Sequence, residues 1–136
     1  MKVDLEKTLD QIENVDWGEP DYPSHLVITC HQLRKKPLKD FTVEDFRIMI
    51  GQNISLDILV PLAFEKLKQN ILAEGHFYPG DLLKNVLTAD TTFWFNNQLL
   101  HRKLTKLYLN NLPSIEKRLD RSIKDSFDDF SKIQFP

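Results

Sequence analysis

The chain has 136 residues, of which 41% are hydrophobic and 28% charged, so it has the length and balance of one globular domain and not of a disordered segment. Its formal net charge of −2 does not favour a nucleic-acid binder, because such proteins usually carry a basic total and one dominant basic face. Only four glycines are present, which favours helices over turn-rich β architecture. The single cysteine, Cys30, excludes an internal disulfide and is predicted to be a small buried residue.

Charge is unevenly distributed along the chain. Residues 1–23 carry a net charge of −5 and residues 24–39 carry four bases and no acid, whereas residues 40–90 carry −4 and residues 91–136 carry +3. Acidic surface of this kind can meet a basic protein partner, although solvation is its commoner reason. The opening residues contain acids throughout, and the longest apolar run, Ile58–Phe64, is too short to cross a bilayer. We therefore expect a cytoplasmic protein without a membrane segment.

Helix signals recur along the chain, and strand signals do not. A weak first helix is predicted from the spacing of four apolar residues, Val3, Leu5, Leu9 and Ile12. It ends at the segment Trp17–Pro23. Ser24 is a good N-cap for a second helix from Leu26 to about Lys36, and Pro37 marks its end.

The stretch FTVEDFRIMI has the signature of a helix start. Thr42 is a good N-cap, and Asp45 three residues later can complete a capping box. Phe41 before the cap and Phe46 inside the helix form a candidate hydrophobic staple. These signals predict a third helix over Val43–Ile50.

Two further helices are predicted in the middle of the chain. Gly51 is the expected left-handed exit of the third helix. The fourth helix should run from Ser55 to about Asn70, and Pro61 inside it predicts either a kink or a start near Val60. A fifth helix is expected over Pro79–Leu87, with the proline at its front edge.

The last third of the chain predicts two more helices. One runs from about Thr92 to Asn110, and the other has the plainest apolar stripe, formed by Ile115, Leu119, Ile123, Phe127 and Phe130. No repeat, low-complexity tract or linker interrupts these segments. The sequence therefore predicts an all-α fold, a single compact domain of six to seven helices over residues 1–136.

The segment AEGHFYPGDLL, from Ala73 to Leu83, gathers an acid, a histidine, two aromatic residues and a proline between apolar segments. As a metal or acid–base site it would use Glu74, His76 and Asp81, but no metal motif has that spacing. The chain also contains no nucleophile elbow, P-loop or dinucleotide-binding glycine motif. The residues alone do not favour catalysis, a cofactor or a metal ion here.

A rigid corner between two helices is the better interpretation of the same segment. Gly75 would reverse the chain as a left-handed terminator, and Gly80 would allow close backbone approach. Phe77 and Tyr78 would plug the junction, and Asp81 would favour the N-terminus of the next helix through its dipole. The corner would then shape a scaffold.

Three adjacent aromatic residues lie in the stretch TTFWFNN, residues 91–97. We expect Phe93 in the core, with Trp94 or Phe95 partly exposed. The sharper alternative is that one of these rings anchors a protein partner, because aromatic residues dominate interface hot spots.

Three stretches between Lys36 and Leu87 resemble the immunity proteins of bacterial contact-dependent growth inhibition (CDI) systems. In chain order they are FTVEDFRIMIGQ, LVPLAFEKL and AEGHFYPGDLL. The chain departs from the family pattern at Phe41 and Phe46, where leucine is usual, and at His76, where a small acidic residue is common. The N-terminal segment and the last two helices carry no family motif, which leaves partner specificity open.

The resemblance implies an immunity protein that binds and neutralises the cognate CdiA C-terminal toxin domain in the bacterial cytoplasm. It implies no enzymatic activity, no cofactor, no small-molecule ligand and no direct contact with nucleic acid. Many toxins of this kind are nucleases, often acting on tRNA. Two alternatives stay open: a helical adaptor or regulatory module of an unrelated pathway, and an enzyme that uses Glu74, His76 and Asp81.

A nuclease toxin must hold phosphates in a basic cleft, and clustered carboxylates on an inhibitor are one means of occupying it. The toxin-binding candidates are Asp57, Glu65, Glu74, His76, Phe77, Tyr78, Asp81 and Trp94. Further candidates in the N-terminal segment are Asp4, Glu6, Asp10, Glu13 and Trp17. Solvation or core packing is the competing explanation for each of them.

Overall fold

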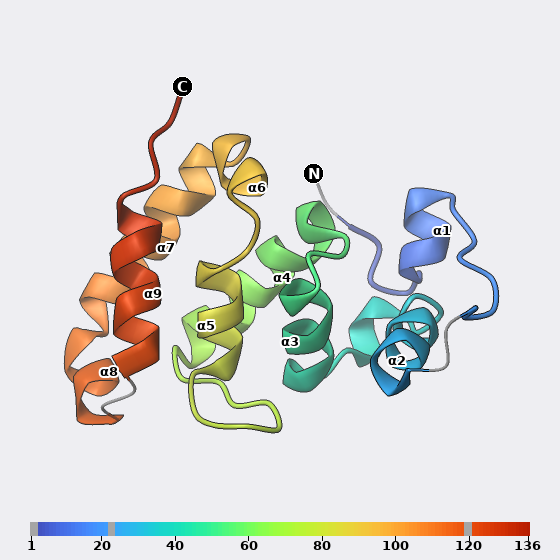
Figure 1. Ribbon diagram of the computed structural model, residues 1–136, viewed down its shortest axis with the longest axis horizontal. Helices are drawn as coiled ribbons and strands as arrows, with labels where there is room; N and C mark the ends of the chain where they lie inside the picture. Colours follow the sequence, from blue (N-terminus) through green and yellow to red (C-terminus); the bar gives the residue numbers. More distant parts are fainter. Residues whose placement is uncertain (1–2, 22–23, 119–120) are drawn as a thin grey trace.

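The structure is a computed structural model that describes residues 3–21, 24–118 and 121–136, and over these residues it is all-α (Figure 1). Its α-helices are α1 Leu9–Glu13, α2 His25–Leu33, α3 Val43–Gly51, α4 Leu56–Gln69, α5 Asp81–Leu87, α6 Thr91–Phe95, α7 Gln98–Asn110, α8 Leu112–Arg118 and α9 Arg121–Ser131, with a 3₁₀ turn at Leu38–Asp40. Along the longest axis, α1 and α2 lie at one end, α3 to α5 in the middle and α7 to α9 at the other end. The predicted all-α fold is confirmed.

Helix α5 lies between α3 and α9 at the centre of the molecule (Figure 1) and packs against both. The three helices contribute fully buried apolar side chains, Met49, Ile50, Leu82, Leu83, Val86 and Ile123. Full burial of one such side chain stabilises the fold by about 1.5–3 kcal/mol relative to exposure. This packing fixes the start of α5, and with it the corner that precedes the helix.

Capping signals around α3 are confirmed. The Thr42 hydroxyl accepts a hydrogen bond from the Asp45 N–H at 3.2 Å, and the Asp45 carboxylate accepts one from the Thr42 N–H at 3.0 Å. The rings of Phe41 and Phe46 pack with their centroids 5.3 Å apart, as a hydrophobic staple requires. The start of this helix is therefore encoded locally.

The predicted left-handed residue at Gly51 is wrong. Gly51 is the last residue of α3, and the positive φ angles occur after it, at Asn53 (57°) and Ser55 (52°). A Cβ at Gly51 would lie 2.7 Å from the side-chain nitrogen of Asn85, which donates to the carbonyl of Arg47. Gly51 thus serves the close approach of α5 rather than a reversal of the chain.

Helix α4 begins at Leu56 and contains Pro61 in its interior, so a start near Val60 is wrong. Proline removes one backbone donor and crowds the preceding turn. The apolar face of the helix compensates, because it buries Leu56, Leu59, Val60, Ala63, Phe64 and Leu67. Packing of the whole helix therefore overrides the local preference of one residue.

The helices near the N-terminus are shorter than predicted. The first is confined to α1, where Thr8 forms a capping box with Gln11. The Ser24 hydroxyl caps α2 as expected, but α2 ends at Leu33, three residues before the predicted Lys36. Lys36 precedes a proline, and that position disfavours helical geometry. The single cysteine in α2 is buried as expected, and burial raises its thiol pKa.

Both predicted helices of the last third are divided. The segment Thr92–Asn110 becomes α6 and α7, separated at Asn96 and Asn97, whose side-chain amides donate to backbone carbonyls one turn back. The final stripe is shared by α8 and α9, with Ile115, Ile123, Phe127 and Phe130 buried. Leu119 of that stripe lies outside the described residues. Among the described residues, no helix has the length and apolar character needed to cross a membrane.

Candidate functional site

The chain between α4 and α5, residues 70–80, forms a tight corner. The Gly80 N–H donates to the Leu72 carbonyl at 3.2 Å, and Glu74 pairs with Pro79 as an isolated antiparallel bridge. In Figure 1 this segment is the long loop below α5. The corner predicted from the sequence is therefore present, and it is bonded through its own backbone.

The buried carboxylate of Asp81 holds the corner from inside. Asp81 is 2% exposed, and its Oδ1 accepts a hydrogen bond from the Gly75 N–H at 2.7 Å. Its Oδ2 accepts from the N–H groups of Phe77 at 3.1 Å and Tyr78 at 3.4 Å. Hydrogen bonds to a charged acceptor are worth about 1.5–3 kcal/mol each. Asp81 does lie in the first turn of α5, but the N–H groups that donate to it are in the preceding loop. Because its side chain is buried, Asp81 is not accessible to a partner protein.

Two residues of α3 outside the predicted set complete this network. The Arg47 guanidinium donates from Nε and Nη2 to the two carboxylate oxygens of Glu44, both at 2.6 Å. Glu44 Oε1 also accepts from the His76 N–H at 2.9 Å, and Arg47 Nε lies 3.8 Å from Asp81 Oδ2. The sequence did contain the signal, an acid and an arginine three residues apart on one helix face.

The hydrogen bonds between Glu44 and Arg47 favour the charged form of both side chains. Hydrogen bonding to the Arg47 guanidinium lowers the pKa of the Glu44 carboxyl, although burial of that carboxyl acts in the opposite direction. The same hydrogen bonds raise the pKa of Arg47. Glu44 and Arg47 are therefore a permanently charged pair at neutral pH, and the pair fixes the corner to α3.

Gly75 and Gly80 serve the corner in different ways. A Cβ at Gly75 would lie 2.5 Å from Glu44 Oε1 and 3.1 Å from Asp81 Oδ2, so a side chain there would displace the carboxylates. The left-handed residue is Gly80, with φ of +91°, and a Cβ there would lie 2.5 Å from Ile123 Cδ1 of α9. The predicted left-handed turn at Gly75 is wrong, whereas the predicted close approach at Gly80 is confirmed.

The outer side of the corner presents an aromatic ring to solvent. Phe77 is 68% exposed, so the prediction that it plugs the junction is wrong. The Arg47 guanidinium carbon lies 4.3 Å from the centroid of the Phe77 ring, which supports one face of the ring. Tyr78 is the inward residue of the pair, since it packs against the core. His76 is exposed, with Nδ1 3.6 Å from Glu44 Oε2.

The other predicted site residues do not gather at the corner. Asp57 is exposed in the first turn of α4, and Glu65, two turns further along, pairs with Lys68 at 2.8 Å. Glu74 is exposed on the corner itself. With Asp81 buried, the carboxylates of the motif region do not form the clustered acidic patch that the sequence suggested.

Trp94 is fully buried, so it does not contact a partner in this fold. Its ring packs edge-on against Phe93 and Phe130, with centroid distances of 4.9 Å in both cases. The expectation of partial exposure holds only for Phe95, which is 39% exposed. The break between α6 and α7 turns Trp94 toward α9, and the sequence did not reveal this break.

Acidic residues near the N-terminus are largely engaged in structural ion pairs. Arg34, the residue that follows α2, is buried, and its Nε donates to Asp10 at 2.7 Å while its Nη1 donates to Glu13. Trp17 covers the guanidinium, whose carbon lies 4.7 Å from the ring centroid. Asp4 and Glu6 are exposed, and Glu6 pairs with Lys39. Asp10, Glu13 and Trp17 therefore fix α1 to α2.

Catalytic and metal chemistry find no support in the arrangement. Within the described residues, no group of three or more His, Cys, Asp and Glu side chains is placed to hold a metal ion. Asp81 is buried and bonded to backbone donors, whereas His76 and Glu74 are exposed. The three groups of the enzyme alternative therefore share no accessible face.

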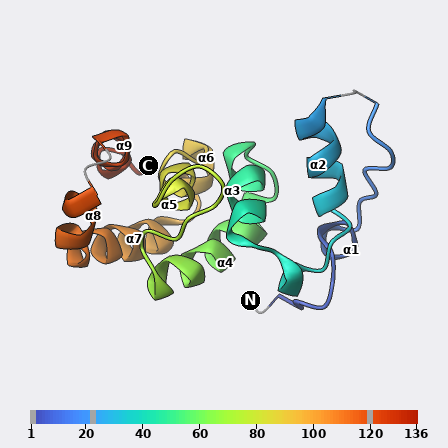
Figure 2. The same cartoon turned by 90° about the horizontal axis from the view of Figure 1, so that it is seen from below.

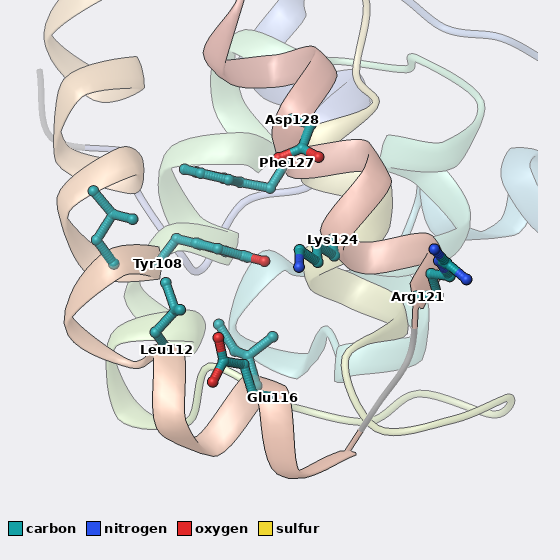
Figure 3. A pocket seen from close by; sticks show the side chains of 9 residues that line it. Tyr108, Leu112, Glu116, Arg121, Lys124, Phe127 and Asp128 are labelled. Atoms are coloured by element: carbon teal, nitrogen blue, oxygen red, sulfur yellow. The ribbon is translucent and has the colours of Figure 1, made fainter.

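A cavity of about 680 Å³ opens between α7, α8 and α9 (Figure 3). Figure 3 shows the rings of Tyr108 and Phe127 face to face, with centroids 3.7 Å apart, above Leu112. Burial raises the pKa of Tyr108, and the nearby carboxylates of Asp128 and Glu116 add to the effect. The cavity is apolar inside, with charges of both signs at its rim.

Comparison with known proteins gives one match. The sequence profile of a family described as CDI immunity proteins matches residues 11–104, which is more than half of the chain. No curated protein and no solved structure shows a significant match. The matched region contains the whole corner together with Glu44, Arg47 and Asp81, and it ends inside α7.

Proposed function

The chain belongs to the family of CDI immunity proteins, and on this premise we propose that it binds the cognate CdiA C-terminal toxin domain in the cytoplasm of the producing cell. Proteins of this family are non-enzymatic toxin inhibitors. Neutralisation would then follow from binding alone, one immunity protein for each toxin domain. The family match over residues 11–104 is the observation that carries this proposal.

The exposed side of the corner is the contact surface that we propose, with Phe77 as its anchor and His76 and Glu74 beside it. Aromatic residues are enriched among the residues that dominate binding energy. A ring held in place before binding also loses little conformational freedom on association. Phe77 meets both conditions, because it is exposed, stacked on Arg47 and bonded through its N–H to Asp81.

An aromatic anchor agrees with the structure better than mimicry of nucleic acid by clustered carboxylates. Of the predicted carboxylates in the motif region, Asp81 is buried and Glu65 is paired with Lys68. Asp57 and Glu74 keep exposed charges, but they lie on different elements. They remain candidates for contacts at the edge of the interface, where charges mainly affect the association rate.

The cognate toxin is proposed to be a nuclease, with tRNA as a substrate, on the basis of the family resemblance. Co-expression in a bacterial host tests the function and the toxin class together. The gene for the toxin domain is induced with and without the gene for this chain, and survival and intact tRNA are scored. We expect survival and intact tRNA only when the chain is present. Equal killing with and without the folded chain would contradict the proposed function, and death with intact RNA would contradict the toxin class.

A further inference from the structure

A second groove lies on the surface between α4 and α7, which pack together on the lower side of Figure 2. Its volume is about 460 Å³, and its apolar lining comes from Pro61, Phe64, Leu100 and Leu107. Phe64 is buried, while Leu100 and Leu107 are half-buried and lie two turns apart on one face of α7. The groove is thus open to solvent over an apolar floor.

The rim of this groove is basic. It carries Lys68 from α4 and Lys103 and Lys106 from α7, and Glu65 is the one acid among the described residues that line it. Glu65 is already paired with Lys68 at 2.8 Å. Lys103 and Lys106 are exposed, and no ion pair of the described residues includes them. The local charge of the rim is therefore unbalanced.

The sequence of α7 makes this imbalance intrinsic to the helix. Between Gln98 and Asn110 it contains Arg102, Lys103 and Lys106 and no acidic residue. A helix whose charged face is merely solvated usually interleaves acids and bases four residues apart. The absence of such pairs leaves two unpaired ammonium groups beside apolar surface, which favours an occupant with negative charge.

The groove shares one lining residue, Lys68, with a neighbouring polar groove that reaches Glu74 of the proposed toxin contact. The lining of that polar groove also includes Pro79 of the corner. Lys117 of α8 adds another base to that polar groove. A partner seated on Phe77 and extending past Glu74 would therefore reach the lysine rim.

We propose that the groove between α4 and α7 receives an acidic amphipathic segment of the toxin domain. The apolar side chains of that segment contact Leu100 and Leu107, and its carboxylates pair with Lys103 and Lys106. This inference rests on the proposed function. The cleft in which a nuclease holds phosphates is basic, so an acidic segment lies outside that cleft. The segment therefore belongs to a surface beside the active site. The immunity protein then inhibits by covering that neighbouring surface and obstructing the substrate.

Nucleic acid is a less suitable occupant of the groove. Single-stranded nucleic acids are held by basic grooves with exposed aromatic platforms on which the bases stack. The one aromatic ring among the described lining residues, Phe64, is buried, and the Lys68 ammonium lies 5.6 Å from its centroid. The chain also carries a net charge of −2.

The test measures association of the purified toxin domain, inactivated in its active site, with the full chain at low and high salt. The double variant Lys103→Glu/Lys106→Glu should associate about tenfold more slowly at low salt and show a weaker salt dependence. Lys103→Gln/Lys106→Gln should show a smaller loss in the same direction. The control Lys7→Glu/Lys132→Glu makes the same change in net charge at two exposed lysines outside the groove and should associate like the wild type.

The possible results distinguish a failure of the groove proposal from a failure of the proposed function. A wild-type chain that does not bind the toxin domain contradicts the proposed function and this inference with it. If the wild type and both groove variants bind the toxin domain equally, the groove proposal is wrong and the proposed function stands. The same holds if the Lys7→Glu/Lys132→Glu control loses as much association rate as the groove variants. A parallel titration uses unfractionated tRNA. If the wild type retains tRNA and Lys103→Glu/Lys106→Glu loses it, the groove belongs to nucleic acid and the proposal is wrong.

Discussion

Glu44 and Arg47 lie one turn apart on α3 and are joined by two hydrogen bonds of 2.6 Å, with side chains that are 9% and 16% exposed. The pair does more than stabilise its own helix. Glu44 accepts the N–H of His76, and Arg47 supports the ring of Phe77, so both residues act on a loop that follows α4. The stretch that resembles the family at α3 and the stretch that resembles it at the corner are thus one physical unit.

Removing the Glu44 carboxylate should loosen that unit. Glu44→Ala leaves the Arg47 guanidinium and the His76 N–H without their acceptor, and we expect the free energy of unfolding to fall by about 2–3 kcal/mol. Urea unfolding at neutral pH measures the change. The control is Glu65→Ala, because Glu65 also pairs with a base three residues away but is 60% exposed. Its effect should stay below about 1 kcal/mol. Equal effects of the two substitutions would show that the network has no special role.

The Glu44 carboxylate should also make the free energy of unfolding depend on pH in the acidic range. The folded-state pKa of Glu44 lies below its ordinary value of 4.5, because Arg47 favours the ionised form. Ionisation of Glu44 therefore adds stability above pH of about 4.5, and this contribution is lost as the pH falls through the folded-state pKa. Glu44→Gln should show a shallower loss of unfolding free energy between neutral pH and pH of about 3 than the wild type. A profile as steep as that of the wild type would assign the acid sensitivity to other groups.

Gly80 should tolerate a side chain less well than another left-handed glycine. Gly80→Ala combines a positive φ with a Cβ 2.5 Å from Ile123 Cδ1, whereas Gly18 has φ of +66° and nothing within 4 Å of its Cβ position. We expect Gly18→Ala to cost about 1 kcal/mol through the backbone alone, and Gly80→Ala to cost about 2 kcal/mol or more. Chemical denaturation of both variants gives the comparison. If Gly80→Ala lowers the free energy of unfolding by no more than Gly18→Ala does, the close contact of Ile123 with Gly80 adds no steric cost.

Phe77 should matter for binding and not for folding. Because it is 68% exposed, Phe77→Ala should change the free energy of unfolding by less than about 1 kcal/mol. Its affinity for the toxin domain should fall by about tenfold or more, as expected for an aromatic anchor. Phe95→Ala removes a second partly exposed phenylalanine, on α6 and away from the corner, and serves as the matched control. Unchanged affinity in Phe77→Ala would remove the corner from the interface.

Sequence reasoning succeeded where the determinants are local. The capping box of Thr42 and Asp45, the staple of Phe41 and Phe46 and the Ser24 cap each depend on residues within five positions of one another. Hydrogen bonds and contacts at that range are encoded by spacing alone. One of the three stretches that carry the family resemblance, FTVEDFRIMIGQ, contains the capping box of Thr42 and Asp45.

Sequence reasoning failed where distant elements decide the outcome. Whether Phe77 or Tyr78 faces inward depends on Arg47 of α3 and on the packing of α5 against α3, neither of which local spacing fixes. Trp94 is buried because α9 supplies Phe130 to its pocket. Tertiary packing overrides local preference in such cases, so the exposed and buried sides of an aromatic pair require the fold.

The central claim is that this chain neutralises a toxin by occupying it and not by modifying it. Titration of the purified toxin domain with the wild-type chain, with residual toxin activity as the readout, tests this most directly. We expect activity to fall linearly and to reach zero at an equimolar ratio, with activity restored when the complex is dissociated. Lasting loss of toxin activity at a small fraction of an equivalent would reveal a catalytic modification, and unchanged activity at excess would show that the chain is no inhibitor of that toxin; either result would contradict the account.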